Sequence, residues 1–152
     1  MKKYLLLLSI LLLSCEKEAP ETTASVMVNV SYKYSNSDET KIASPTLVML
    51  FGENSTEFDF DESVNSIYSS QKMTLKNGSK ATPKYTSSSF SGINTFEEVE
   101  KGKYTVIAYY KPDGYTWAFS YYFAYKNIVV DDLQVHKIIF TWSDDAGKFV
   151  NK

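Results

Sequence analysis

The sequence contains no arginine, one cysteine and one histidine, and each scarcity excludes a class of function. Its 16 basic residues are all lysines, and its 18 acidic residues outnumber them, which gives a net charge of −2. Specific nucleic-acid binding relies on clustered basic charge and on the bidentate guanidinium of arginine, so we expect no nucleic-acid partner. The lone Cys15 forms no intrachain disulfide and no cysteine-rich zinc site, and His136 has no second histidine with which to share a metal. We therefore expect neither a metal nor a cofactor.

The first fifteen residues have the composition of a secretory leader. Lys2 and Lys3 supply positive charge, and the apolar run from Leu5 to Leu13 is interrupted only by Ser9. This run is too short for a transmembrane helix, which needs about 20 residues. It fits the hydrophobic region of a signal peptide.

The leader ends in Leu12-Leu13-Ser14-Cys15, and this end resembles the lipobox of bacterial lipoproteins. The resemblance implies that the signal peptide, residues 1–14, is removed and that Cys15 carries the lipid. Each buried methylene contributes about 0.8 kcal/mol, so several acyl chains hold a soluble domain on a membrane almost permanently. The alternative is an incidental free thiol, although such cysteines are usually buried inside a fold.

Residues 15–24 are predicted to form a flexible tether, because they are polar and include Pro20. Glu16 follows the cysteine, at the position where an aspartate retains some lipoproteins at the inner membrane, and this difference favours the outer membrane. The acidic residues after Cys15 also resemble the surface-export signal of some Gram-negative lipoproteins. We expect a cell-envelope protein that is lipid-anchored in the outer membrane and surface-exposed, with the periplasmic face as the alternative.

The rest of the chain shows the two-residue periodicity of β-strands. Valines occupy every second position from Val26 to Val30, and Thr46–Phe51 is a short apolar run typical of a buried strand. Asn77-Gly78 predicts a two-residue hairpin turn. Residues 57–61 alternate weakly, and the serine- and threonine-rich residues 86–91 favour a loop.

The strongest strand patterns lie between residues 96 and 142. Every second residue from Tyr104 to Tyr110 shares one face of a strand, and the same holds for His136 to Trp142. About seven short strands and no amphipathic helix predict an all-β fold, a single antiparallel β-sandwich over residues 25–142. A polar tail is predicted over residues 143–152.

Residues 96–108 read Phe-Glu-Glu-Val-Glu-Lys-Gly-Lys-Tyr-Thr-Val-Ile-Ala. This pattern resembles a segment of prealbumin-like domains, which include the carboxypeptidase-regulatory-like modules of bacterial surface proteins. The resemblance implies a strand, a glycine turn and a core strand, in a structural or interaction module without catalysis. An immunoglobulin-like sandwich is the alternative arrangement.

Aromatic residues are concentrated in one predicted hairpin. Residues 111–114, Lys-Pro-Asp-Gly, predict a tight turn, and a return strand then carries aromatic side chains at every odd position from Tyr115 to Tyr125. Phe119 and Phe123 are expected in the core. The candidate ligand-binding residues are Tyr115, Trp117 and Tyr121, because exposed tyrosine and tryptophan dominate binding sites; the alternative for these three is also core packing.

Candidate catalytic residues are scarce. The acidic residues Glu57, Asp59, Asp61 and Glu62 have no calcium-loop spacing and more often form a solvated strand edge. His136 has neither a partner nor a nucleophile motif. We therefore expect a non-catalytic structural or interaction module, bound to the membrane through its lipid and open to a protein or glycan partner. A carbohydrate-binding lipoprotein is the alternative, and a hydrolase with paired carboxylates is a less favoured one.

Overall fold

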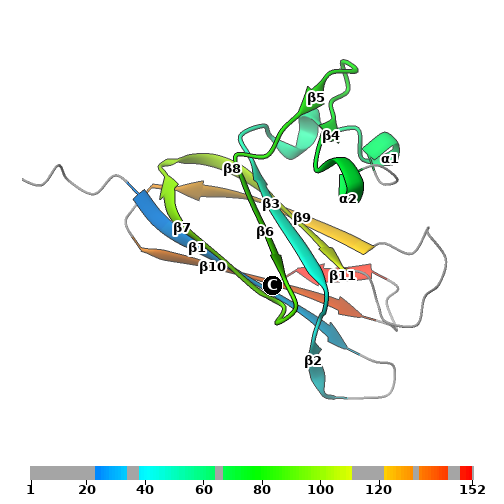
Figure 1. The fold of residues 1–152 in the computed structure, drawn as a ribbon, viewed down its shortest axis with the longest axis vertical. Helices are drawn as coiled ribbons and strands as arrows, with labels where there is room; N and C mark the ends of the chain where they lie inside the picture. The colour runs from blue at the N-terminus through cyan, green and yellow to red at the C-terminus, as the bar shows by residue number, and fades with distance from the viewer. Residues whose placement is uncertain are drawn as a thin grey trace, which may run out of the picture.

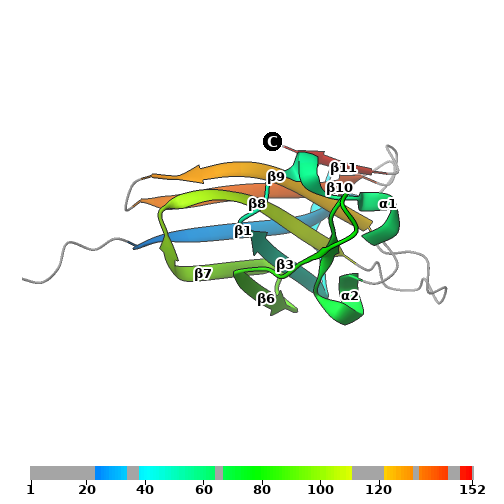
Figure 2. The same ribbon diagram turned by 90° about the horizontal axis from the view of Figure 1, so that it is seen from above.

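The computed structural model describes residues 23–33, 38–63, 67–110, 122–131, 134–143 and 148–151. These residues form two β-sheets packed face to face, with a small additional segment over the outer face of one sheet (Figure 1, Figure 2). The predicted fold class, an all-β sandwich, is therefore confirmed. Among the described residues there are eleven strands rather than about seven.

The first sheet, called sheet A, is built around the amino-terminal strand β1. Its members are β1 (Thr23–Lys33), β2 (Thr40–Ile42), β7 (Ile93–Glu100), β10 (Val135–Ser143) and β11 (Lys148–Asn151). On one side β1 pairs in parallel with β10, from Ser25 opposite Val135 to Lys33 opposite Ser143. On its other side β1 pairs with β7 and then with β2, both antiparallel. The sandwich is thus not purely antiparallel. In addition, β11 lies within the range predicted as a polar tail, where it pairs with β10.

The second sheet, sheet B, is antiparallel throughout. Its strand order is β6 (Tyr85–Ser89), β3 (Thr46–Phe51), β8 (Gly102–Tyr110) and β9 (Tyr122–Val130). The prediction of a loop over residues 86–91 is wrong, because β6 pairs with β3 along its length. Serine and threonine carry no hydrophobic periodicity, and alternate residues of this edge strand are exposed.

Both faces of the central strands β3 and β8 are buried. Their even-numbered residues, such as Val48 and Val106, pack against sheet A in the main core, as predicted for the face from Tyr104 to Tyr110. Their odd-numbered residues, such as Met49 and Ile107, form a second apolar cluster on the outer face of sheet B. This second cluster explains why residues 46–51 form an uninterrupted apolar run.

The cap segment, residues 52–63 and 67–81, covers this outer face. It consists of the 3-10 turn η1 (Ser55–Glu57), α1 (Phe60–Ser63), α2 (Ile67–Ser70), β4 (Met73–Thr74) and β5 (Lys80–Ala81). Phe58, Ile67 and Met73 are buried in the second cluster. The weak strand predicted over residues 57–61 is therefore wrong. Its alternating phenylalanines belong to a turn and a short helix instead.

The predicted Asn77-Gly78 hairpin is confirmed, with a longer turn. β4 pairs with β5, and the loop closes through hydrogen bonds from Leu75 N to Ser79 O and from Gly78 N to Leu75 O, each 2.8 Å. The loop thus contains residues 76–78, with Gly78 at φ +83°. A glycine in the left-handed conformation at the last loop position is common in three-residue hairpins.

A β-bulge in β7 accounts for the spacing of Phe96 and Val99. Val26 pairs with Phe96 but Ala24 pairs with Val99, so β7 has one extra residue there, and Glu98 adopts φ 58°. The extra residue turns both Phe96 and Val99 into the core, where they are 5% and 0% exposed. In a regular strand, side chains three residues apart would point to opposite faces.

The predicted tight turn at residues 111–114 and the predicted return strand from Tyr115 lie outside the described residues, apart from the part of that strand that starts at Tyr122. Tyr110 pairs with Tyr122, so residues 111–121 connect β8 to β9. Among the described residues no helix has the length and apolar character needed to cross a membrane.

We expect Gly92→Ala to destabilise the fold strongly. Gly92 has φ +68°, and an added Cβ would lie 2.6 Å from both the Val30 carbonyl oxygen and the Ile42 Cγ2 atom. The free energy of unfolding, measured by urea denaturation, should fall by at least about 2 kcal/mol. Gly78→Ala is the matched control, because Gly78 also has a positive φ but no atom within 4 Å of the added Cβ. It should lose about 1 kcal/mol; equal losses would contradict the steric explanation.

Candidate functional site

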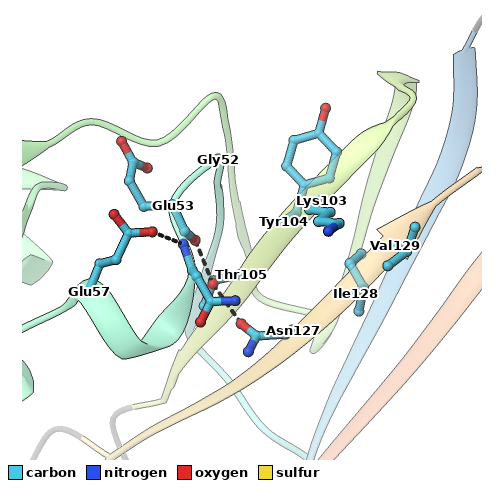
Figure 3. Close-up of a pocket in the computed structure, with 10 residues that line it drawn as sticks. Gly52, Glu53, Glu57, Lys103, Tyr104, Thr105, Asn127, Ile128 and Val129 are labelled. Carbon is cyan, nitrogen blue, oxygen red and sulfur yellow. Dashed lines mark hydrogen bonds between the residues drawn. The ribbon is translucent and has the colours of Figure 1, made fainter.

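A cleft of about 460 Å³ lies where the cap segment meets the outer face of sheet B (Figure 3). One wall is the turn that follows β3, and the other is formed by the start of β8 and the end of β9. The cleft is lined by Gly52, Glu53, Asn54, Glu57, Lys103, Tyr104, Thr105, Asn127, Ile128 and Val129.

A polar network at the base of the cleft attaches the turn to sheet B. The Thr105 hydroxyl lies 2.7 Å from the Glu53 carbonyl oxygen and 2.8 Å from Asn127 Oδ1, and it can donate to either. Asn127 Nδ2 donates to Ser55 Oγ at 2.8 Å, while Ser55 N donates to Asn127 Oδ1 at 3.3 Å. Asn127 therefore satisfies a donor and an acceptor of the cap segment at once and holds η1 in place.

A capping box fixes the conformation of η1. Asn54 Oδ1 accepts a hydrogen bond from Thr56 N at 3.0 Å, and Glu57 Oε1 accepts one from Asn54 N at 2.9 Å. Each side chain satisfies a backbone N–H that the short turn leaves without an internal partner. The carboxylate of Glu57 thus has a structural role in the wall of the cleft.

The cleft holds two carboxylates, which is the arrangement that the hydrolase alternative requires. Figure 3 shows Glu53 and Glu57 on the turn, away from Ile128 and Val129 on the opposite wall. Glu57 is engaged in the capping box, and the buried Oε2 atom of Glu53 has no hydrogen-bond partner among the described residues. Lys103 is the cation of the opposite wall.

Burial raises the pKa of two tyrosines in β8. Tyr104, whose side chain is 3% exposed, donates to the Glu100 carbonyl oxygen at 2.9 Å. Its pKa is raised to about 12, chiefly by burial and further by the neighbouring Tyr85 and Glu100. Burial alone raises the pKa of Tyr109 in the second cluster. Both phenols therefore stay neutral well above physiological pH.

A second groove, of about 440 Å³, lies between the cap segment and β9. Phe60 stacks on Tyr125 with ring centroids 4.4 Å apart, and on Phe123 with centroids 5.4 Å apart. Tyr125 is still 41% exposed. Hydrogen-bonding side chains surround this pair of rings: Ser55, Thr56, Asp59, Asp61 and Lys76. The groove therefore combines an aromatic surface with carboxylate, hydroxyl and ammonium groups.

Several predicted site residues lie outside the described part of the chain. They are Cys15, Tyr115, Trp117, Phe119 and Tyr121. Phe123, which was expected in the core, is partly buried and packs against the second cluster rather than the main core. The main-core positions of β9 are even-numbered, such as Ala124.

The predicted acidic residues are separated by the structure. Glu57 belongs to the cleft, whereas Asp59 and Asp61 line the groove. Within the described residues no group of three or more histidine, cysteine, aspartate or glutamate side chains could hold a metal ion. His136 is partly buried in β10, and the apolar residues that follow it at alternate positions, Ile138, Phe140 and Trp142, are in the main core.

No protein-family model matches this sequence, and no curated protein shows significant sequence similarity. Two solved structures resemble the fold. One is a Pseudomonas aeruginosa protein provisionally described as carbohydrate binding, with 13% identity, a TM-score of 0.43, and coverage of 83% of this chain and 92% of the other. The other is Serratia marcescens Lip, a membrane-bound component of the Type VI secretion system, with 11% identity, a TM-score of 0.41 and coverage of 87% and 96%. At these scores neither resemblance defines the function of this chain.

We expect Tyr104→Phe to reduce the loss of stability in alkali. The folded-state pKa of Tyr104, about 12, exceeds its ordinary value of 10.0, so its contribution is complete below about pH 10 and is lost as the pH rises towards 12. At about pH 11 the Tyr104 contribution to the free energy of unfolding should have fallen by roughly 1 kcal/mol. The variant should lack this part of the decline while losing about 1 kcal/mol at neutral pH with the hydrogen bond to Glu100.

The measurement is urea unfolding at neutral and alkaline pH. Tyr125→Phe serves as the control, because Tyr125 is an exposed tyrosine in the neighbouring strand. If the free energy of unfolding of Tyr104→Phe and of Tyr125→Phe declines in alkali as much as that of the parent, burial of Tyr104 is not the cause of the decline.

Proposed function

We propose that this protein is a lipid-anchored lipoprotein of the bacterial cell envelope, attached to the outer membrane through Cys15 and exposed on the cell surface. Its β-sandwich is a non-catalytic module that binds a partner, and the prealbumin-like topology implied by residues 96–108 is part of the proposal. The observation that carries it is the position of Thr23, the first residue of β1, which lies at the end of the sandwich away from the connection between β8 and β9.

Thr23 marks the end of the domain nearest the proposed anchor. It pairs with Glu100 at the end of β7, close to Gly102, which pairs with Val130 at the end of β9. Cys15 and Thr23 are eight residues apart along the chain, so the segment that joins them spans at most about 29 Å when fully extended. The sandwich would therefore stay close to the bilayer.

β8 ends and β9 begins at the opposite end of the sandwich. Tyr110 and Tyr122, which flank residues 111–121, lie at the end where β1 finishes, since the Tyr110 ring contacts Tyr32 with centroids 5.7 Å apart. Tyr115, Trp117 and Tyr121 belong to this connection. An anchor at one end and an aromatic-rich connection at the other support presentation of a binding surface away from the membrane.

Carbohydrate binding is the second candidate, and the groove beside β9 favours it. Tyr125 is an exposed aromatic residue of the same hairpin, and Asp59 and Asp61 lie beside it in the groove. The apolar face of a sugar stacks on an aromatic ring, while its hydroxyl groups need nearby acceptors and donors. The groove supplies both kinds of contact, and its volume suits a small ligand.

We expect Cys15→Ala to abolish leader processing and membrane association, because the acyl chains would have no sulfur to join. Fractionation of cells that express the variant, with an immunoblot for the shift in mass, measures both effects. Ser14→Ala is the matched control, since it keeps a small residue before Cys15 and should be processed normally. A Cys15→Ala protein that still sediments with the outer membrane would refute the anchor.

We expect Tyr125→Ala to weaken glycan binding by about tenfold or more, because one aromatic contact in a binding site contributes about 1.4 kcal/mol or more. Tryptophan fluorescence quenching or a glycan array with plant and host polysaccharides measures the binding. Ile139→Ala, an exposed apolar truncation on the other sheet, should bind as the parent does. Absence of binding by the parent across these glycans would remove the carbohydrate proposal and leave a protein partner.

A further inference from the structure

The outer face of sheet A, opposite the sandwich core, exposes large apolar side chains. Ile42 is 65% exposed, Ile93 48%, Val135 52% and Ile139 44%. They come from β2, β7 and β10, and Met27 of β1 lies among them at the surface, partly buried. We call these five residues the sheet A patch. Sheet B differs, because the cap segment covers most of its outer face.

The register places the sheet A patch in rows across β1. Ile139 and Ile93 flank Asn29 on opposite sides, and in the next row on that face Lys137 and Thr95 flank Met27. Ile42 is opposite Ser31, one row further along. The apolar residues thus lie on both sides of β1, whereas Lys137 lies on the β10 side and the exposed Glu97 on the β7 side.

We propose that the sheet A patch binds a second copy of this chain, face to face, about a two-fold axis that runs along β1. Such an axis places β10 of each copy over β7 of the other. Ile139 then packs against Ile93 of the second copy, and Met27 meets its own counterpart on the axis. Each contact occurs twice, as a closed two-fold interface requires.

The charges on this face agree with the same axis. Rotation about β1 brings Lys137 of one copy over Thr95 and the neighbouring Glu97 of the other, so a cation meets an anion on each side of the axis. Lys33, at the end of β1, is the exception on this face, because it lies on the axis and meets its own counterpart. Complementary charges at the rim steer association and define its register.

The position of the tether gives a third reason, which rests on the proposed lipid anchor. An axis along β1 leaves the two β1 strands running in the same direction, so both Thr23 residues lie at the same end of the dimer. Both anchors can then enter one membrane. An axis across β1 would place the two Thr23 residues at opposite ends, roughly 35 Å apart by the length of an eleven-residue strand.

The first test measures the mass of the full lipidated chain in detergent by light scattering. The parent should be a dimer, and Ile139→Lys should convert it to a monomer. Val129→Lys is the matched control, because Val129 is 53% exposed on the outer face of sheet B, and it should remain dimeric. A monomeric parent, or a Val129→Lys protein that dissociates as Ile139→Lys does, would overturn the proposal.

The second test examines the direction of the axis by cross-linking with a bis-maleimide that spans the about 10 Å between packed sheets. Met27→Cys should cross-link to itself. Ile139→Cys should not do so alone but should cross-link when mixed with Ile93→Cys chains. A cross-link of Ile139→Cys to itself with none for Met27→Cys would refute the axis.

A charge reversal tests the pairing of Lys137 with Glu97, and recovery of the dimer in the double variant would not result from misfolding. Lys137→Glu should weaken the dimer at least tenfold, and the double variant Lys137→Glu/Glu97→Lys should restore it. Failure of the double variant to recover would refute the pairing. The Cys15→Ala chain distinguishes the dimer proposal from the anchor proposal, because it should lose membrane association yet still dimerise at sufficient concentration. A patch variant that loses only the dimer leaves the anchor proposal intact.

Discussion

Burial of both faces of β3 and β8 is the constraint on which the rest of the molecule depends. Antiparallel sheets commonly leave one face in water, and the outer face of sheet A follows that rule. Sheet B does not, because Met49 and Ile107 on its outer face are as fully buried as Val48 and Val106 in the main core. An apolar outer face needs a cover, and the cap segment is that cover.

The cleft and the groove follow from the way this cover ends. The cap segment buries the middle of sheet B, but it stops short of Lys103 at the start of β8 and Val129 at the end of β9. Hollows therefore form along its margin on both sides of η1. Asn127 attaches η1 to β9 between these hollows, since it hydrogen-bonds both the backbone N–H and the side chain of Ser55. The shape of the concave surface is a consequence of packing, and its chemistry comes from the polar residues of η1.

Much of the sandwich could be predicted from the sequence, and the reasons for the failures are physical. Alternation from Val26 to Val30 and the apolar run of β3 report burial directly, so these strands were predicted correctly. In the cap segment the sequence predicts the Asn77-Gly78 hairpin but not η1 or α1, because Phe58 and Phe60 alternate as a strand would and α1 is a single turn long. Pairing of β1 with β10 depends on contacts more than a hundred residues apart, which no local pattern contains. In the site, Thr105 and Asn127 are ordinary polar residues of two strands, and only the register of β8 and β9 brings them together.

The position of β1 has a mechanical consequence. Any force that reaches the domain through its amino-terminal segment enters at Thr23 and acts along the axis of β1. This strand is held on one side by nine residue pairs with β10 and on the other by β7 and β2. Load applied along a strand shears its hydrogen bonds together instead of opening them one after another. A sandwich pulled through this segment is thus loaded through its most firmly held strand, and its survival under pulling is governed by the rate of unfolding rather than by equilibrium stability.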